Sequence, residues 1–278
     1  MSRTTERVRP AGRAAPYRAV LSSRISSQRS HRASFRVDLL SSLLVGAVEL
    51  AEVVVLYLQV ERIGGLDLAA VLLVFAIADT GFSLADMVVG HCDNIPDYVR
   101  AGTLDVFYLR PQPLLLQLMT SDLQLRRLAR GTVAIVVLVV AIDLNDLALS
   151  PRTVALLSLA LVSATLCFAA MFVWAGGAQF FLIDGAETTN AFVYGGRYAA
   201  TQPATVWGRP LLVVFGFFFP MAFTAYFPVV TLLGLDGAEQ LGLPQWIGWT
   251  APVATFWAWV LASVSWRAGV RHYQGGGG

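Results

Sequence analysis

Beyond Asp67 at the very start of the second run, four carboxylates lie inside two apolar runs, 39–60 and 66–89, that are each long enough to cross a bilayer. Glu49 and Glu52 are three residues apart, and Asp79 and Asp86 are seven apart, so each pair shares one face of a helix. An ionised carboxylate at mid-bilayer is strongly unfavourable unless it is paired or hydrated. Neither run contains an arginine. We therefore expect Glu49, Glu52 and Asp79 to face protein or a water-filled cavity.

Three roles are open for these acids. They line a cavity for a cationic or amphipathic substrate, or they form hydrogen bonds between helices that fix the packing, or they relay protons. Asp86 lies nearer the edge of its run. We expect it to meet Arg36 or Arg130.

A second polar cluster, YVRAGTLDVFYLRPQP at 98–113, lies between two long apolar runs. We call it the knot. Asn94 and Asp97 have the spacing of a capping box, and Gly102 suits the position that follows a helix. The pattern predicts a two-turn helix over 95–101, roughly parallel to the membrane. Tyrosine and arginine dominate binding hot spots, so the knot could dock a partner. An interfacial belt of aromatic residues and arginines explains it equally well.

A third cluster combines prolines with aromatic residues near the end of the apolar run 211–233. Pro220 and Pro228 each remove a backbone donor and break a helix. We expect a re-entrant gate built from Pro220, Phe223, Tyr226 and Pro228. The alternatives are a passive kink and an aromatic surface that faces lipid or a second copy of the chain.

The composition explains why these clusters stand out. The 278 residues are 56% hydrophobic and only 14% charged, with a mean hydropathy of +0.63, whereas soluble domains carry about 25% charged residues. We therefore predict an integral membrane protein. The chain contains no lysine, which excludes a P-loop of its own and lysine Schiff-base chemistry.

Catalytic and metal sites are not predicted. The three histidines are scattered, and the adjacent residues of HCD at 91–93 cannot all turn to one metal. A disulfide between Cys92 and Cys167 is not expected. Nucleic-acid binding is not predicted either, because the basic N-terminal residues come before six spans and have no interleaved aromatic platform for bases.

The apolar runs predict an all-α polytopic membrane protein with six spans, because a helix of about 20 apolar residues crosses a bilayer. The expected spans are 39–60, 66–89, 128–142, 154–183, 211–233 and 246–266. Residues 114–130 form either an amphipathic extension of the third span or a separate surface helix.

Arginines set the expected orientation. Nine precede the first span, five lie in the 90–130 connection, two in 184–210 and two in the C-terminal tail, whereas the other connections hold one, one and none. The positive-inside rule then places both termini and the knot in the cytoplasm. In the basic segment 1–36, apolar residues from about residue 14 share one helical face, which favours an amphipathic helix on the inner leaflet over a disordered tail.

Several motifs together give the chain a family resemblance. The run IGG at 63–65 is followed one span later by RAGTLDVFYLRPQPLLLQLM at 100–119, and FPMAFTAYFPVVTLLG at 219–234 and RAGVRHYQGGGG at 267–278 come after it. In this order they resemble the signature of ABC-2-type transporter permeases over most of residues 36–275. The matching residues of the second motif are Arg100, Gly102, Leu104, Asp105, Leu109, Arg110, Pro111 and Gln117. The chain departs from the pattern at Leu66-Asp67 and at Gln202-Pro203.

The resemblance implies a permease domain over 37–274, followed by a flexible glycine tail at 275–278. It implies that the N-terminal amphipathic helix is a connecting helix and that the knot is a coupling helix in a groove of a separate ATPase. The residues implied at that interface are Asp97, Tyr98, Arg100, Asp105, Tyr108 and Arg110. Two ATPase subunits would use ATP and Mg, and this chain would bind no cofactor and catalyse nothing itself.

The expected protein is therefore a permease of the inner (plasma) membrane that pairs with a second permease, identical or paralogous, among membrane lipids. It would export an amphipathic or hydrophobic substrate by alternating access. Two other functions are open. One is an ion-coupled secondary carrier that uses Glu49, Glu52 and Asp79, and the other is a membrane scaffold without transport.

Overall fold

The computed structural model describes residues 32–121, 128–182 and 186–273. Within these ranges the regular elements are helices and there is no strand beyond an isolated bridge between Ile63 and Leu66. The predicted all-α class is confirmed. The predicted amphipathic helix of the N-terminal segment and the glycine tail fall outside the described residues.

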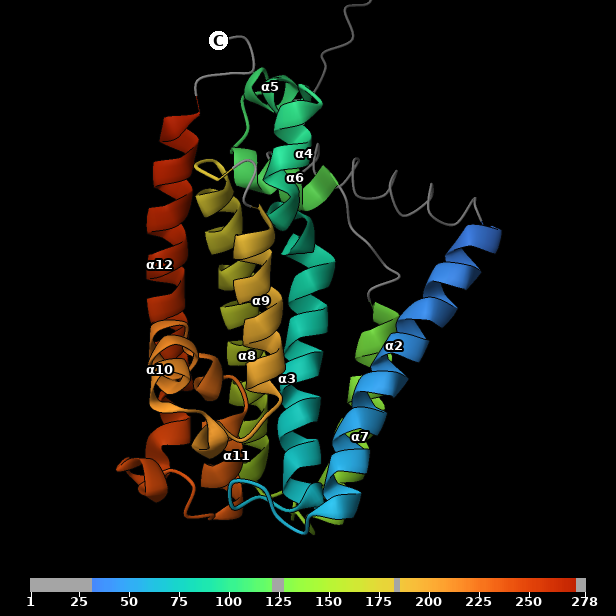
Figure 1. The fold of residues 1–278 in the computed structure, drawn as a ribbon, viewed down its shortest axis with the longest axis vertical. Coiled ribbons are helices and arrows are strands. Elements are labelled where there is room, and N and C mark those ends of the chain that lie inside the picture. The colour runs from blue at the N-terminus through green and yellow to red at the C-terminus, as the bar shows by residue number, and fades with distance from the viewer. Residues whose placement is uncertain (1–31, 122–127, 183–185, 274–278) are drawn as a thin grey trace, which may run out of the picture.

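The elements follow one another as a bundle of long helices with short ones at both ends (Figure 1). The long helices are α2 (Arg32–Gln59), α3 (Leu68–Val89), α7 (Leu128–Leu144), α8 (Pro151–Gln179), α9 (Ala186–Ala200) and α12 (Ala251–His272). The short elements after α3 are η1 (Gly90–Asn94), α4 (Ile95–Arg100), α5 (Thr103–Tyr108) and α6 (Leu114–Ser121). Those between α9 and α12 include α10 (Arg209–Leu211), η4 (Leu212–Phe218), η5 (Met221–Phe223), α11 (Tyr226–Leu233) and η7 (Gln245–Thr250).

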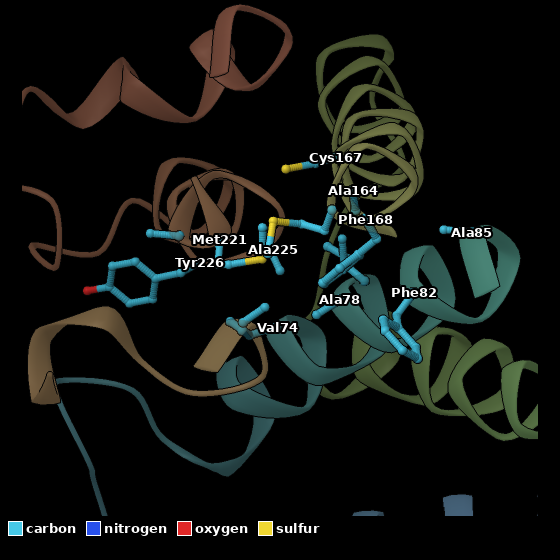
Figure 2. Packing of buried hydrophobic residues seen from close by; sticks show 14 of the residues in the cluster. Val74, Ala78, Phe82, Ala85, Ala164, Cys167, Phe168, Met221, Ala225 and Tyr226 are labelled. Atoms are coloured by element: carbon cyan, nitrogen blue, oxygen red, sulfur yellow. The ribbon is translucent and has the colours of Figure 1, made fainter. Parts of the chain in front are cut away.

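The core lies where α3 and α8 meet. A Cβ atom added to Gly81 of α3 would lie 2.6 Å from the Cβ of Ala164 on α8, so the two backbones approach each other closely. Phe82 and Phe168 pack edge to face with ring centroids 5.3 Å apart. Figure 2 shows side chains from α3, α8 and the segment 221–226 gathered in one cluster. This cluster is the frame that positions the polar residues described below.

Small residues also bring α8 and α12 together. A Cβ atom on Gly177 would collide with the backbone of Ser265 and Trp266. The backbones of α8 and α12 therefore approach each other closely at this glycine.

Helix α7 packs on α3 at one side of this core, and α2 lies against α7 (Figure 1). Helix α2 packs mainly on α7, where a Cβ atom on Gly46 would lie 3.0 Å from Cγ of Arg130. Most of its apolar side chains are exposed. Helix α2 is therefore joined to the rest of the molecule mainly through α7, whereas α7 itself packs closely on α3, where a Cβ atom on Gly131 would lie 3.0 Å from the Cβ of Ser83.

Four helical stretches in the described part are long and apolar enough to cross a membrane: Leu39–Gln59, Leu68–Arg100, Pro151–Gln179 and Gln245–His272. A fifth is a broken pair, Arg209–Phe218 and Met221–Leu233, bent by 64°. Helix α7, the third predicted span, has 17 described residues, and the residues that join it to α6 fall outside the described part. A multi-pass helical protein is thus shown, and the count of six spans stays a prediction.

The helix expected over 95–101 exists as α4, but two of its predicted details are wrong. Leu68–Arg100 is one helical stretch of 33 residues, and Figure 1 shows α4 continuing in line with α3 instead of turning aside. The side chain of Asn94 makes no capping hydrogen bond. Gly102 does adopt the left-handed conformation, with φ 65°, that ends this rod.

The prediction that residues 184–210 form a connection between two spans is also wrong in part. Residues Ala186–Ala200 form α9, which lies against α3 and α8 in the bundle (Figure 1). The sequence did not indicate this helix, because it contains polar residues and because its 15 residues are too few for an independent span of about 20 residues.

Candidate functional site

Arg197 of α9 joins the acids of two other helices. Its Nε donates a hydrogen bond of 2.9 Å to Oδ1 of Asp79, and its Nη1 donates one of 2.9 Å to Oε1 of Glu49. Nη2 contacts both carboxylates. Helices α2, α3 and α9 are therefore tied together by one guanidinium group.

Arg130 of α7 is the second cation of this group, which we call the ion cluster: Glu49, Asp79, Arg130 and Arg197. Nη1 of Arg130 lies 4.0 Å from Glu49, and Nε lies 3.9 Å from Asp79. Both guanidinium groups stand over the ring of Phe82, at 5.0 and 5.1 Å. The two negative charges of the acids and the two positive charges of the arginines balance. This balance offsets most of the unfavourable free energy of burying charged side chains at this depth.

The ion cluster lies deep in the bundle. Asp79 is near the midpoint of the 22-residue helix α3 and is 1% exposed, and Arg197 is also buried. The absence of arginine from the runs 39–60 and 66–89 gave no partner for Glu49 or Asp79 in the sequence. The signal that could have found it is the lone arginine of YGGRYAA at 194–200, flanked by glycines and small residues as packed helices often are.

Glu52 has a different neighbour. It accepts a hydrogen bond of 2.8 Å from the hydroxyl of Tyr198, and both side chains are exposed. The three acids predicted together thus all lie beside α9, but only Glu49 and Asp79 share a partner. The geometry fits a packing role for these two. That Glu49, Glu52 and Asp79 line a substrate cavity stays a prediction.

The knot forms a compact cap on the end of the α3–α4 rod. The hydroxyl of Tyr273 donates a 2.8 Å hydrogen bond to Asp105, and its ring stacks on Tyr108 at 5.6 Å. The ring of Tyr98 packs edge to face on Phe107 at 5.9 Å. The C-terminal end of α12 therefore braces α5 directly.

The outer side of the knot combines charge with exposed apolar surface. Arg110 stands over Phe107 at 5.8 Å, and Arg100 lies 3.8 Å from Asp97. Leu109 is 85% exposed and Val106 is 50% exposed. Sequence reasoning did not single out these two, although exposed leucine and valine beside arginine are typical of a docking patch. Packing and the charge of Asp105 raise the pKa of Tyr108, so its phenol stays protonated at neutral pH.

Polar side chains link the residues just before the knot, which form its base, to α9. The backbone amide of Ile95 donates to Oε1 of Gln179 at 3.2 Å, and Nε2 of Gln179 donates to Thr189 at 2.9 Å. One turn further along α9, Tyr194 donates to Asp93 at 3.0 Å. Helix α9 therefore contacts the base of the knot at one end and carries Arg197 near the other.

The predicted gate region is broken at Pro220 as expected, but Pro228 does not break the chain, because it lies in the first turn of α11. A π-helical segment, η4, ends at Phe218, and Pro220 precedes the short helix η5. The ring of Phe223 packs on Phe227 at 4.8 Å and on Phe217 at 5.9 Å. A bent pair with a π-helix is a common feature of functional helices.

Two of the four gate residues are held firmly. Tyr226 is fully buried, and Pro228 is buried where η7 meets α11, since a Cβ atom on Gly248 would lie 2.8 Å from its Cα. The re-entrant shape fits a gate, and the assignment of Pro220, Phe223, Tyr226 and Pro228 to it stays a prediction.

In the described ranges no three His, Cys, Asp or Glu side chains are grouped so as to hold a metal ion. Cys92 and Cys167 are both buried free thiols. The three predicted groups of site residues thus occupy three places: the knot at one end of the bundle, the ion cluster at mid-depth and the aromatic break beside α11.

A comparison with family models gives one match, described as ABC-2 family transporter protein, over residues 43–277. Curated proteins give no match, and solved structures give none either. The matched range includes the knot, the ion cluster and the broken helix.

Proposed function

This chain belongs to the ABC-2 transporter family, and we propose from that premise that it is the permease subunit of an ATP-driven exporter. Permeases of this family work with ABC ATPase subunits. Two ATPases would bind ATP and Mg, and a second permease, identical or paralogous, would complete the transport pathway. The substrate would be amphipathic or hydrophobic.

The knot is the observation that supports this proposal most. It ends a continuous helical rod, it is braced by α12 through Tyr273, and it exposes Leu109 and Val106 beside Arg110. A surface of this kind suits a groove on another protein. Closure of the two ATPases around ATP would draw the two knots together and switch the pathway from inward to outward access.

The proposed setting is the inner (plasma) membrane, with both termini and the knot on the cytoplasmic side. The arginine distribution supports this orientation, although Arg197 no longer counts as a loop charge because it is buried against Asp79.

Co-expression with an ABC ATPase encoded beside this chain tests the proposal. The variants Leu109→Arg and Arg110→Ala are expected to lower co-purification of the ATPase and to uncouple ATP hydrolysis from transport, because both change the outer side of the knot. The matched control is Leu149→Arg, since Leu149 is 66% exposed in the connection between α7 and α8, at the other end of the bundle. Normal co-purification and coupled transport in both knot variants would contradict the docking role.

The ion-coupled carrier gains no support from the ion cluster. Glu49 and Asp79 are both held by Arg197 and approached by Arg130, whereas a proton relay needs acids that lose and regain protons readily. Transport by the purified chain alone, driven by a proton gradient, would favour the carrier and overturn the permease proposal.

A further inference from the structure

The knot contacts the long helices at its base and again near its outer end. At the base, α4 continues the rod of α3, and the amide of Ile95 donates a hydrogen bond of 3.2 Å to Gln179 at the end of α8. Further out, α5 contacts Tyr273, the residue that follows α12. Figure 1 shows the C-terminal end of α12 at the same end of the bundle as α5. A rod that is held only at its base can tilt, whereas a second contact further out fixes its direction.

Helix α5 depends on contacts outside itself. It has six residues, Thr103–Tyr108, and a helix of this length is not stable alone in water. One support is local in the chain, because Nε2 of Gln117 on α6 donates a hydrogen bond of 3.0 Å to the carbonyl oxygen of Phe107. Tyr273 is a support of another kind, since it lies 168 residues after Asp105. It therefore relates the position of α5 to that of a distant helix, α12.

Tyr273 meets α5 through two contacts of different kinds. Its hydroxyl donates a hydrogen bond of 2.8 Å to Oδ1 of Asp105. Its ring stacks on Tyr108, with an angle of 14° between the two ring planes. Asp105 and Tyr108 are three residues apart, so they share one face of α5. A hydrogen bond fixes a point and a stacked ring fixes a plane, and the two together set the orientation of α5 about its own axis.

The end of α12 that carries Tyr273 is itself held firmly against α8. Phe180, which follows α8, packs edge to face on Tyr273 and on Trp266, with ring centroids 5.9 Å apart in both pairs. A Cβ atom on Gly269 would collide with the backbone of Gly177, so the two helices are in close contact there. Closely packed elements transmit a displacement instead of absorbing it. A movement of α5 would therefore reach α8 and α12 together through Tyr273.

The residues of α5 and its C-terminal neighbours divide into two groups. Asp105 and Tyr108 contact Tyr273. Leu109 and Arg110 lie on the outer side of the knot and are exposed. A partner can therefore bind the outer side while α5 stays in contact with Tyr273. Because different residues make the two contacts, substitutions can separate docking from positioning.

We propose that Tyr273 is a positioning residue that transmits movement between the knot and the α8–α12 pair. It holds α5 at a fixed angle to α12, so that a partner ATPase that displaces the knot displaces these two helices as well. Asp105 acts with Tyr273 and makes no contact with the ATPase. The positioning of α5 does not depend on a partner, whereas the transmission of ATP-driven movement rests on the proposed function.

Hydrogen exchange of the full chain in detergent, without an ATPase, tests the positioning. Tyr273→Phe removes the hydroxyl and keeps the ring, and it is expected to speed amide exchange in α5 about fivefold, as the loss of one hydrogen bond implies. The matched control is Tyr198→Phe, which removes a tyrosine–carboxylate hydrogen bond of the same 2.8 Å length, to Glu52, and is expected to leave exchange in α5 unchanged. Unchanged exchange in Tyr273→Phe, or an equal increase in the control, would overturn the proposal.

A double-mutant cycle tests the role of Asp105. Asp105→Leu removes the acceptor, and it is expected to speed exchange in α5 as Tyr273→Phe does. Combining the two substitutions is expected to add little, because both break the same hydrogen bond. Fully additive effects would show that the hydroxyl acts elsewhere and would overturn the assignment of Asp105.

The complex with its ATPase tests the transmission. In the native complex we expect ATP and Mg to change hydrogen exchange in α8 and α12. Tyr273→Ala is expected to lose this change while the ATPase still co-purifies and hydrolyses ATP, and Tyr273→Phe, which keeps the stacked ring, is expected to retain part of it.

Two results would overturn the transmission. One is a change of native size in Tyr273→Ala, and the other is loss of ATPase binding in that variant, which would make Tyr273 part of the docking surface. If no ATPase associates with the native chain, the proposed function fails, and the exchange comparison in the chain alone still decides whether Tyr273 positions α5.

Discussion

Helices α3 and α2 have the same mean hydropathy, 2.1, over their most apolar segments, yet 83% of that segment is buried in α3 and 11% in α2. Helix α3 meets α8 through Gly81 and the aromatic rings around Phe82. Helix α2 meets α7 at Gly46 and reaches α9 through Glu49 and Glu52.

The difference shows that hydrophobicity alone does not hold these helices in place. In lipid, an apolar side chain gains little by leaving the acyl chains for protein, so close packing and polar bonds decide which helices stay together. Helix α3 uses close packing, and α2 uses polar bonds to α9 in addition to its contact with α7. The two helices should therefore respond to different substitutions.

The largest effect is expected for Arg197→Met. It leaves two carboxylates facing Arg130 alone, and breaking a buried ion pair costs about 3–5 kcal/mol of stability. Unfolding of the purified chain by SDS, followed by tryptophan fluorescence, measures the change.

The control for this variant is the double substitution Arg197→Met with Glu49→Met. It leaves Asp79 and Arg130 as a balanced pair 3.9 Å apart, so the double variant is expected to be more stable than the single one. A double variant that is less stable than Arg197→Met would contradict the charge balance.

The next largest effect is expected for Gly81→Leu, which tests the close packing of α3. The added side chain would meet Ala164 and its backbone, and overpacking typically costs about 1–3 kcal/mol. Gly195→Leu on α9 is the matched control, because nothing lies within 4 Å of a Cβ atom there. Thermal unfolding of both variants in detergent should separate them, and similar losses in the two would refute the close α3–α8 packing.

The smallest effect is expected for Tyr198→Phe, which removes the hydrogen bond to Glu52. A single hydrogen bond contributes about 0.5–1.5 kcal/mol, and this one is exposed at both ends. The same SDS titration measures it. A loss as large as that of Arg197→Met would mean that Glu52, and not the ion cluster, is the main attachment of α2 to α9.

Local signals in the sequence account for much of this fold. Long apolar runs mark α2, α3, α8 and α12, Gly102 marks the end of α4, and Pro220 marks the break before α11. Each of these depends on residues close together in the chain, which composition and spacing report directly.

The ion cluster could not be predicted in the same way. Asp79 and Arg197 are 118 residues apart, and no local pattern selects one arginine among 20 basic residues as the partner of a particular acid. Helix α9 was hidden because its polar residues and 15-residue length resemble a connection.

Helix α9 also constrains how the chain is made. With 15 residues it is about 22 Å long, shorter than the roughly 30 Å hydrocarbon core, and it carries Arg197, so it is a poor candidate for insertion as an independent segment during synthesis. Its partners Glu49 and Asp79 are translated more than 100 residues earlier. The first two helices would therefore enter the bilayer before Glu49 and Asp79 have an arginine partner. Arg197 would bond to these acids only after most of the protein has been translated.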